Sequence, residues 1–321
     1  MRVLGLDIGG TKCAAVLADV GKNIHILQKI RFDTCAEQGC GDALGRLTDA
    51  ARQLIGESET AVCAIGVSCG GPLDSRRGVI QSPPNLPGWD DVPICAILRE
   101  KFGIPAFLQN DANACALVEW KPGAGRGCED MVFLTMGTGM GAGIVAGGRL
   151  LRGACDMAGE VGHIRLDHDG PVGYGKAGSF EGFSSGGGIA RLACMMRSDW
   201  RRQGNAPEWK ESDEALTARA LAGYARAGDG FARCVFDTAG EYLGRGVAVI
   251  ADLLNPEKVV IGGVFMRCAD LIEPAMWKAI HREALPHTCR NLQVVPAETG
   301  EQIGDFAAAM VAVYGMEEAQ I

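Results

Sequence analysis

The chain has 321 residues, of which 47% are apolar and 22% charged, a composition typical of a globular protein with room for two domains. Its formal net charge of −8 argues against a broad nucleic-acid-binding face, which would need to be basic. The start MRVLGLD lacks a signal-peptide pattern, and no apolar run reaches the roughly 18 residues of a membrane span. We therefore expect a cytoplasmic protein without a nucleic-acid or membrane partner.

The 13 cysteines are scattered, and no two of them form a C-x-x-C pair. Several lie in apolar runs, such as Cys63 and Cys115. Because a free cysteine behaves as a small buried hydrophobic residue, we expect reduced thiols rather than a disulfide framework.

The chain opens with a short apolar strand that runs into a glycine turn and a second apolar run, VLGLDIGGTKCAAVLA. The same pattern returns about 130 residues later as MVFLTMGTGMGAGIVA, so that residues 6–9 align with residues 134–137. A fainter third copy is AIGVSCGGPLD at 64–74. The repetition predicts a β-hairpin with a phosphate-sized turn, written at least twice.

Helical spacing of apolar residues predicts further elements between and after these hairpins. The expected helices cover residues 43–56, 90–103, 111–120, 186–196, 214–229, 231–254 and 305–315. Strands are expected at 104–109 and 258–263, and the charged span 197–214 is expected to be a solvated excursion. Duplicated hairpins with interleaved helices indicate two related α/β lobes facing a cleft, as in actin-like ATPases. The predicted lobes are residues 1–113 with the last helix, about 304–321, and residues 114–303.

The turn DIGGTK places Asp7 at the end of a buried strand, followed by Gly9, Gly10, Thr11 and Lys12. Glycines let the backbone approach a phosphate, and successive N–H groups form an anion-binding concavity. The Asp7 carboxylate could hold Mg²⁺ through water. A single glycine pair could be a plain hairpin turn, but the second turn, with Gly137, Thr138 and Gly139, favours phosphate binding.

Asn110 and Asp111 follow a predicted strand and open a predicted helix. Asp111 could therefore be a helix N-cap, or it could be a general base that takes a proton from a substrate hydroxyl during phosphoryl transfer. Spacing alone leaves both interpretations open.

Three later groups could bind a polyhydroxylated ligand or a nucleotide. Glu160 and His163 lie between glycines and offer acceptors and a donor for adjacent sugar hydroxyls, although a structural pair in a loop is the alternative. Glu181 could be a third hydroxyl ligand or a surface charge. Gly262 and Gly263 end a strand and could let adenine lie against the backbone.

Eight stretches, taken together and in order, resemble the ROK family of sugar kinases and repressors over essentially the whole chain. They are LGLDIGGTK, GVSCGGPLD, PPNLPGWDD, NDANACALVEW, LTMGTGMGAG, AGEVGHIRL, SFEGFSSG and VVIGG. The resemblance implies an actin-like, ribonuclease H-like fold of two lobes with ATP and Mg²⁺ in the cleft between them. It also implies transfer of the γ-phosphoryl group to a hydroxyl, commonly O6, of a hexose such as glucose or of an N-acylhexosamine.

The resemblance also assigns roles to residues. Asp111 matches the catalytic base, and Gly71, Asn110, Glu160, His163 and Glu181 match the sugar-binding positions. The two phosphate turns match Gly9, Gly10 and Thr11 and Gly137, Thr138 and Gly139, and the adenosine side matches Gly262 and Gly263. Members of the family are often dimers or tetramers, so a homo-oligomer is expected.

Two other functions belong to different classes. A sugar-responsive repressor of the same family would carry a helix-turn-helix before the first hairpin, where Asp7 leaves no room for one. A sugar-binding module without catalysis would not need Asp111 and both phosphate turns. The identity of the sugar stays open.

The stretch GHIRLDHDGPVGYGKAGSFEGF departs from the family pattern. In many ROK proteins the histidine of the G-H pair binds a structural zinc ion together with three cysteines of a C-x-C-G-x-x-G-C-x-E knuckle. Here Val172, Tyr174 and Ser179 stand at the cysteine positions, and none of them replaces a thiolate at a four-coordinate zinc site. We therefore expect no zinc, with the loop held by packing of Val172, Tyr174 and Phe180, and with His163 turned to the sugar.

Overall fold

A computed structural model describes the chain apart from residues 206, 208, 210–211, 213–214 and 321 and the side chain of residue 301. The chain divides into two compact units. Unit 1 comprises Met1–Gly127, Leu150–Ala158 and Glu301–Ile321, and unit 2 comprises Cys128–Arg149 and Gly159–Gly300.

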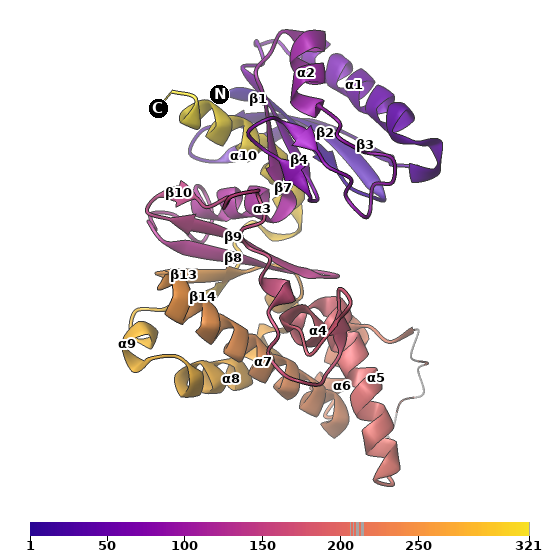
Figure 1. The fold of residues 1–321 in the computed structure, drawn as a ribbon, viewed down its shortest axis with the longest axis vertical. Coiled ribbons are helices and arrows are strands. Elements are labelled where there is room, and N and C mark those ends of the chain that lie inside the picture. Colours follow the sequence, from indigo (N-terminus) through magenta and orange to yellow (C-terminus); the bar gives the residue numbers. More distant parts are fainter. Residues whose placement is uncertain (206, 208, 210–211, 213–214, 321) are drawn as a thin grey trace. The chain divides into compact units, whose positions relative to one another are not determined.

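Unit 1 is built on a five-stranded sheet with the strand order β3-β2-β1-β4-β7 (Figure 1). Its strands are β1 Arg2–Ile8, β2 Lys12–Val20, β3 Ile24–Asp33, β4 Ala64–Cys69 and β7 Ala106–Asn110. The first three strands are antiparallel neighbours, whereas β1, β4 and β7 run parallel. The strands β1 and β4 are almost fully buried and apolar, as expected for strands covered on both faces. A separate short hairpin joins β5 Leu73–Asp74 to β6 Val79–Ile80.

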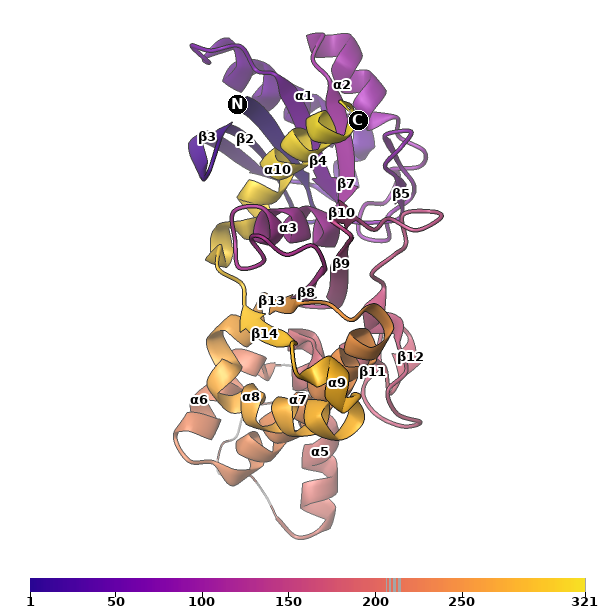
Figure 2. The same ribbon diagram turned by 90° about the vertical axis from the view of Figure 1, so that its left-hand side faces the viewer.

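Four helices cover this sheet, two on each face (Figure 2). They are α1 Cys40–Gly56, α2 Ile94–Phe102, α3 Asp111–Trp120 and α10 Ile303–Glu318, and a short 3₁₀ turn spans Ala36–Gln38. Helix α10 approaches the sheet closely because Gly5 and Gly66 lack a side chain. A Cβ on Gly66 would lie 2.1 Å from the carbonyl oxygen of Ala308, and one on Gly5 would lie 2.8 Å from the Ala309 nitrogen. Glycine at these two positions therefore lets α10 pack closely on the sheet of unit 1.

Unit 2 contains a second five-stranded sheet with the order β10-β9-β8-β13-β14. Its strands are β8 Met131–Met136, β9 Met140–Ala146, β10 Arg149–Leu150, β13 Lys258–Ile261 and β14 Gln293–Pro296. As in unit 1, the central pair is an antiparallel hairpin, and parallel strands follow on one side of it. The predicted duplication is confirmed in the fold, because β8 and β9 occupy the places in their sheet that β1 and β2 occupy in the other.

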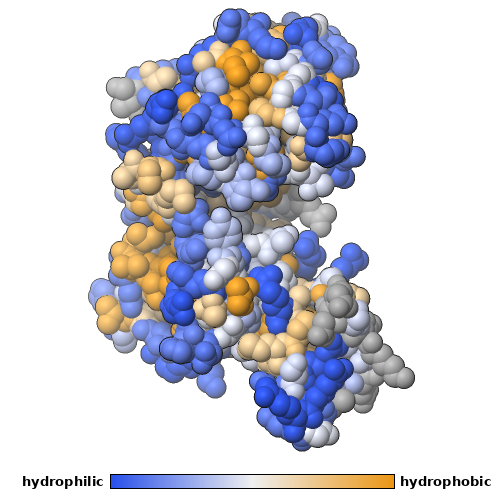
Figure 3. Space-filling view, turned by 45° about the vertical axis from the view of Figure 1, so that its right-hand side comes forward, coloured by the Kyte–Doolittle hydropathy of each residue, from blue (hydrophilic) through white to orange (hydrophobic). Residues whose placement is uncertain are grey.

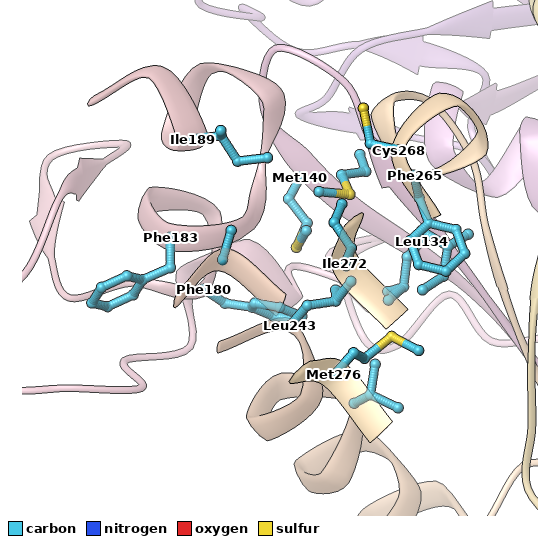
Figure 4. Packing of buried hydrophobic residues seen from close by; sticks show 14 of the residues in the cluster. Leu134, Met140, Phe180, Phe183, Ile189, Leu243, Phe265, Cys268, Ile272 and Met276 are labelled. Atoms are coloured by element: carbon cyan, nitrogen blue, oxygen red, sulfur yellow. The ribbon is translucent and has the colours of Figure 1, made fainter. Parts of the chain in front are cut away.

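Helices pack on the second sheet to form the core of unit 2. They are α4 Phe180–Ser184, α5 Gly186–Arg202, α6 Ala218–Arg226, α7 Gly230–Leu254, α8 Val264–Glu283 and α9 Pro286–Cys289. The short strands β11 Val172–Gly173 and β12 Lys176–Ala177 and the 3₁₀ turns Val161–His163 and Gly300–Gln302 lie outside the sheet. Figure 4 shows Leu134 and Met140 of the sheet among helical side chains of this core, including Phe180, Leu243 and Ile272. The face of the molecule in Figure 3 is largely hydrophilic.

The structure differs from the sequence-based expectation at the unit boundary, at the third hairpin and at one helix. The boundary expected near residue 113 falls within α3, which belongs to unit 1. The third copy of the hairpin is wrong, because β4 is a parallel neighbour of β1 and its glycines lead into the separate β5–β6 hairpin. Helix α8 was not expected, since Pro274 interrupts its helical pattern.

The charged span at 197–214 is only partly the solvated excursion we expected, and six of its residues lie outside the described part of the chain. Helix α5 continues to Arg202, and Arg197 is buried with its guanidinium over the ring of Trp209. The arginine is accommodated because its planar cation can lie on an aromatic face. Within the described residues no helix is long and apolar enough to cross a membrane.

Candidate active site

The predicted site residues of unit 1 meet at one edge of its sheet. Because β1, β4 and β7 are parallel, their carboxyl ends lie side by side, with Ile8 beside Cys69 and Cys69 beside Asn110. The phosphate turn follows β1, Gly71 follows β4, and Asp111 follows β7. In parallel sheets this edge is where ligands bind.

The turn between β1 and β2 consists of Gly9, Gly10 and Thr11 and is closed by a hydrogen bond from the Gly9 nitrogen to the Lys12 carbonyl oxygen, 3.1 Å. In the described part of the chain, the N–H groups of Gly10 and Thr11 donate to no protein acceptor. A Cβ on Gly10 would lie 2.4 Å from the carbonyl oxygen of Asn85, which stands behind the turn. The turn thus combines two available N–H donors with a position that only glycine fits.

The negative charges of Asp7 and Asp111 repel each other at this edge. Burial raises the pKa of Asp7 to about 6, with contributions from the charges of Asp111 and Asp305 that outweigh a hydrogen bond from Ser68. Burial also raises the pKa of Asp111, against the hydrogen bond that its carboxylate accepts from the Ala112 nitrogen. By residue surface Asp111 is exposed to solvent, whereas Asp7 is half-buried. Two carboxylates with raised pKa values fit a site that receives a cation and a proton.

The choice between helix cap and base at Asp111 is clarified by the structure. The N-cap of α3 is Asn110, whose side-chain oxygen accepts a hydrogen bond from the Ala112 nitrogen at 2.9 Å. Asp111 is the first residue of the helix, so the alternative interpretation of Asp111 as the cap is wrong. The side-chain nitrogen of Asn110 would lie 3.4 Å from a Cβ on Gly71, which brings these two predicted sugar-binding positions together.

In unit 2 the second turn, Gly137, Thr138 and Gly139, lies against the strand end that carries Gly262 and Gly263. The Gly262 nitrogen donates to the Leu134 carbonyl oxygen at 2.9 Å. Gly263 has a φ of 72°, and a Cβ there would lie 2.2 Å from the Met136 carbonyl oxygen. The position therefore needs glycine for both its backbone conformation and its close approach to the turn.

The amino-terminal end of α5 also belongs to this cluster, and sequence reasoning missed it. The Gly186 nitrogen donates to the Gly137 carbonyl oxygen at 2.8 Å, and the Gly187 nitrogen donates to that of Thr138 at 3.2 Å. The Ser185 hydroxyl caps the helix by accepting a hydrogen bond from the Gly188 nitrogen. The run SSGGG carried the signal, since a serine cap followed by glycines marks a helix end that another backbone can approach.

Glu181 is tied to the second turn. One of its carboxylate oxygens accepts a hydrogen bond from the Met140 nitrogen at 3.0 Å, and the same oxygen would lie 2.7 Å from a Cβ on Gly139. A Cβ on Gly162 would lie 3.3 Å from the Glu181 Cβ, so the Gly159–His163 stretch runs beside it. Glu181 is thus neither a plain surface charge nor a wholly uncommitted sugar ligand, because one carboxylate oxygen is already engaged.

His163 and Glu160 lie on the same short stretch of unit 2. Glu160 is exposed, and its carbonyl oxygen accepts a hydrogen bond from the His163 nitrogen. The His163 ring contacts Tyr174 edge to face at 5.0 Å, and the Lys176 ammonium donates to the His163 carbonyl oxygen at 2.6 Å. The structure thus brings Glu160, His163 and Glu181 into one cluster within unit 2, whereas Asp7 and Asp111 belong to unit 1.

The residues at the zinc-knuckle positions do not fit a zinc site. Val172 is 51% exposed and Tyr174 is 68% exposed, so the expected packing of these two side chains is wrong, whereas Phe180 is fully buried as expected. Ser179 is buried and caps α4 through a hydrogen bond from the Gly182 nitrogen. Among the described residues, no group of three or more His, Cys, Asp or Glu side chains could hold a metal ion.

Comparison with known proteins gives consistent relatives. A family model described as the ROK family matches residues 3–314. A glucokinase of Thermotoga maritima is 32% identical over 314 residues, which are 97% of each chain. The crystal structure of a ROK hexokinase from Thermus thermophilus is 34% identical with a TM-score of 0.81, and the match covers 99% of this chain and 100% of that one. A ROK family glucokinase from Streptomyces griseus in complex with glucose and AMPPNP is 28% identical with a TM-score of 0.76, over 98% and 100% of the two chains.

Proposed function

The chain belongs to the ROK family, and from this premise we propose that it is an ATP-dependent kinase that phosphorylates a hydroxyl, O6 by preference, of a hexose or N-acylhexosamine. The fold is the actin-like ATPase fold predicted from the sequence. The observation that carries the proposal is the grouping of Asp7, Asp111 and the glycine turn at one sheet edge. This edge combines phosphate donors, a place for a cation and a base.

Asp111 is the proposed base. In phosphoryl transfer the protein mainly positions the reactants and neutralises charge, and a carboxylate accepts the proton of the attacking hydroxyl. The raised pKa of Asp111 suits this role, because a base works best when its pKa approaches the operating pH. The attacking sugar oxygen forms a bond to the γ-phosphorus. At the same time the bond between the γ-phosphorus and the β-γ bridging oxygen breaks, and Asp111 receives the proton of the sugar hydroxyl.

Asp7 is the proposed carboxylate for Mg²⁺. Burial first, and then the charge of Asp111, raises the pKa of Asp7, and a bound divalent cation would offset both effects. Hard cations prefer carboxylate oxygens. When bound with ATP, Mg²⁺ neutralises charge on the phosphate oxygens. The residues present at this edge therefore fit the ion that the family implies.

The remaining residues bind rather than react. Backbone N–H groups of both turns donate hydrogen bonds to phosphate oxygens, from Gly10 and Thr11 in the first turn and from Thr138 and Gly139 in the second. Lys12 adds a positive charge at the start of β2. Gly262 and Gly263 receive the adenosine part of ATP. For the sugar, we propose hydroxyl contacts from Asn110, with Gly71 beside it. We propose further hydroxyl contacts from Glu160, from His163 and from the second carboxylate oxygen of Glu181.

We also propose that the protein works without a structural zinc ion and as a homo-oligomer in the cytoplasm. The first part is supported by Val172, Tyr174 and Ser179, which supply no thiolate at the three knuckle positions. The homo-oligomer is expected because members of the family are often dimers or tetramers, and light scattering of the purified chain tests it.

The central experiment is a coupled assay of ADP release with a panel of glucose, mannose, fructose, N-acetylglucosamine and N-acetylmannosamine. We expect magnesium-dependent activity with at least one of them and none with Asp111→Asn. The phosphorylated position is identified by NMR of the product. If none of these sugars is phosphorylated by the folded wild-type chain, the proposed function is wrong.

A further inference from the structure

Thr34, just beyond β3, touches the first phosphate turn from behind with both its backbone and its side chain. Its hydroxyl donates to the Gly9 carbonyl oxygen at 2.6 Å. Its backbone nitrogen donates to the Thr11 carbonyl oxygen at 2.8 Å. The Thr34 residue is completely buried, so water does not reach its hydroxyl or its N–H group.

The direction of the Thr34 hydroxyl hydrogen bond is fixed by its surroundings. The Cys13 sulfur lies 3.4 Å from the same hydroxyl oxygen. Burial raises the pKa of the Cys13 thiol, which keeps it protonated and able to donate to the Thr34 oxygen. The hydroxyl hydrogen of Thr34 therefore goes to Gly9, whose carbonyl oxygen has no hydrogen of its own to offer.

Holding these carbonyls orients the turn. In a trans peptide the carbonyl and the following N–H point in opposite directions. Because the Gly9 carbonyl is held toward Thr34, the Gly10 N–H points to the other side. The peptide has no side chain to stop it from rotating, since glycine backbone is permissive and the turn contains two glycines. A flipped peptide would present a carbonyl oxygen to a phosphate in place of a donor.

Thr34 is itself held in place by Arg46 of α1. The Arg46 guanidinium donates to the Thr34 carbonyl oxygen at 2.8 Å and to the Asp33 carbonyl oxygen at 2.6 Å. Asp42, one helical turn earlier, accepts a hydrogen bond from the Arg46 Nε at 2.7 Å, and the guanidinium lies 5.0 Å from the Phe32 ring centre. The planar guanidinium thus connects helix α1 to the segment that carries Thr34.

We propose that Thr34, supported by Arg46, is a positioning residue that fixes the Gly9 peptide so that the first turn presents its N–H groups to the phosphates of ATP. Thr34 does not touch the substrate and does not take part in the chemical step. The inference rests on the proposed kinase function and concerns the binding of one substrate, ATP, rather than of the sugar.

The test replaces Thr34 by valine, which has nearly the same shape and keeps the backbone N–H but loses the hydroxyl. We expect KM for ATP to rise about tenfold, with KM for the sugar unchanged and kcat lowered less than KM is raised. Thr34→Ser restores the hydroxyl and should bring KM for ATP back to within about twofold of the wild-type value.

Thr48→Val is the matched control. Thr48 is also a buried threonine of unit 1, and its hydroxyl donates to the Gly45 carbonyl oxygen at 2.9 Å, within α1 and away from the turn. The two valine variants should lose similar thermal stability, but only Thr34→Val should bind ATP more weakly. An equal KM for ATP in the two variants would overturn the proposal.

A second variant keeps the inference testable if Thr34→Val does not fold. Arg46→Lys keeps the charge but cannot make the same set of hydrogen bonds, and we expect KM for ATP to rise about threefold without a change in KM for the sugar. An unchanged KM for ATP contradicts the support role of Arg46. Failure of the proposed function would appear differently, as a folded wild-type chain that phosphorylates no sugar of the panel.

Discussion

The two phosphate turns of the molecule share a strand pattern but are held in different ways. Each joins an antiparallel hairpin at the centre of a five-stranded sheet, and the strand order around it is the same. The first turn is held by a side chain, Thr34, whereas the second is held by the amino-terminal N–H groups of α5, at Gly186 and Gly187.

The strand that leads into each turn differs as well, at its second-last residue. Asp7 of β1 corresponds to Thr135 of β8, whose hydroxyl accepts a hydrogen bond from the Gly141 nitrogen at 3.3 Å. The first turn therefore stands beside ionisable carboxylates, and the second stands beside neutral backbone and one carboxylate, Glu181, that is partly engaged. The duplicated fold thus has a charged half, the first turn with Asp7 and Asp111, which suits the reaction. It also has a largely neutral half, the second turn with the start of α5, which suits binding.

The largest effect should follow from removing the proposed base, Asp111. We expect Asp111→Asn to lower kcat by about 10² to 10⁴, because general-base assistance is lost while the side-chain shape is kept. Sugar affinity, measured by calorimetry, should change little. Asp199→Asn, an exposed position on α5 of unit 2, is the matched control and should keep full activity. Retention of more than a few per cent of kcat by folded Asp111→Asn would leave Asp111 without a catalytic role.

The second prediction concerns the stability cost of the charged half. A carboxyl group whose folded-state pKa is raised to about 6 stabilises the fold below its unfolded pKa, and this contribution is lost as the pH rises through about 6. Asp7→Asn cannot ionise, so above pH 6 it should be more stable than the wild type by roughly 1–3 kcal/mol, and the difference should vanish near pH 3.

Urea unfolding at several pH values measures this difference, while the same variant should lose magnesium-dependent activity. Mg²⁺ should narrow the difference in stability at neutral pH, because the ion binds the wild-type carboxylate and not the asparagine. A difference in unfolding free energy that does not depend on pH would show that the folded protein does not raise the pKa of Asp7.

The sequence predicted the part of this comparison that depends on local pattern. The glycine turns, the strand before each of them and the helix at 111–120 are encoded by neighbouring residues, and the structure has them. What holds each turn could not be predicted, because Thr34 reaches Gly9 through tertiary packing and belongs to no motif. The sequence left open whether Asp111 caps α3, since Asn110 and Asp111 are both good N-cap residues and only the backbone conformation separates them.

A pair of glycine substitutions sharpens the comparison. At Gly10 a Cβ would meet the backbone oxygen of Asn85 at 2.4 Å, and backbone cannot move cheaply. At Gly139 it would meet the end of the Glu181 side chain at 2.7 Å, which can turn away. We therefore expect Gly10→Ala to cost about 1–2 kcal/mol of stability, and Gly139→Ala to cost little but to raise KM for the sugar about fivefold.

Gly41→Ala is the control for both glycine variants. Gly41 lies in α1 with nothing within 4 Å of its added Cβ, so alanine should be neutral or stabilising there by up to about 1 kcal/mol. Thermal melting and sugar titrations separate the three variants. Equal loss of stability in Gly10→Ala and Gly139→Ala would mean that the two turns tolerate a side chain in the same way.

The smallest effect should come from treating the chain with a chelator, because side-chain contacts connect the loop at 163–183 to the rest of unit 2. The Tyr242 hydroxyl of α7 donates to Asp167, and its ring stacks on Phe183 with centres 3.5 Å apart. The buried Phe180 ring rests on Gly246, where a Cβ would lie 2.3 Å from it. Because these contacts join the loop to α7 and the three knuckle positions carry no thiolate, we expect the purified chain to contain much less than about one zinc ion. We also expect a chelator to leave its melting temperature unchanged.

Tyr242→Phe keeps the stacked ring but loses the hydrogen bond to Asp167, and it should raise KM for the sugar by about twofold to fivefold while KM for ATP stays constant. The sugar is affected because this loop carries Glu181 and begins beside His163, whereas the first turn lies in unit 1 and is held by Thr34. A chelator effect larger than that of Tyr242→Phe, together with about one zinc ion per chain, would show that metal and not these side chains holds the loop.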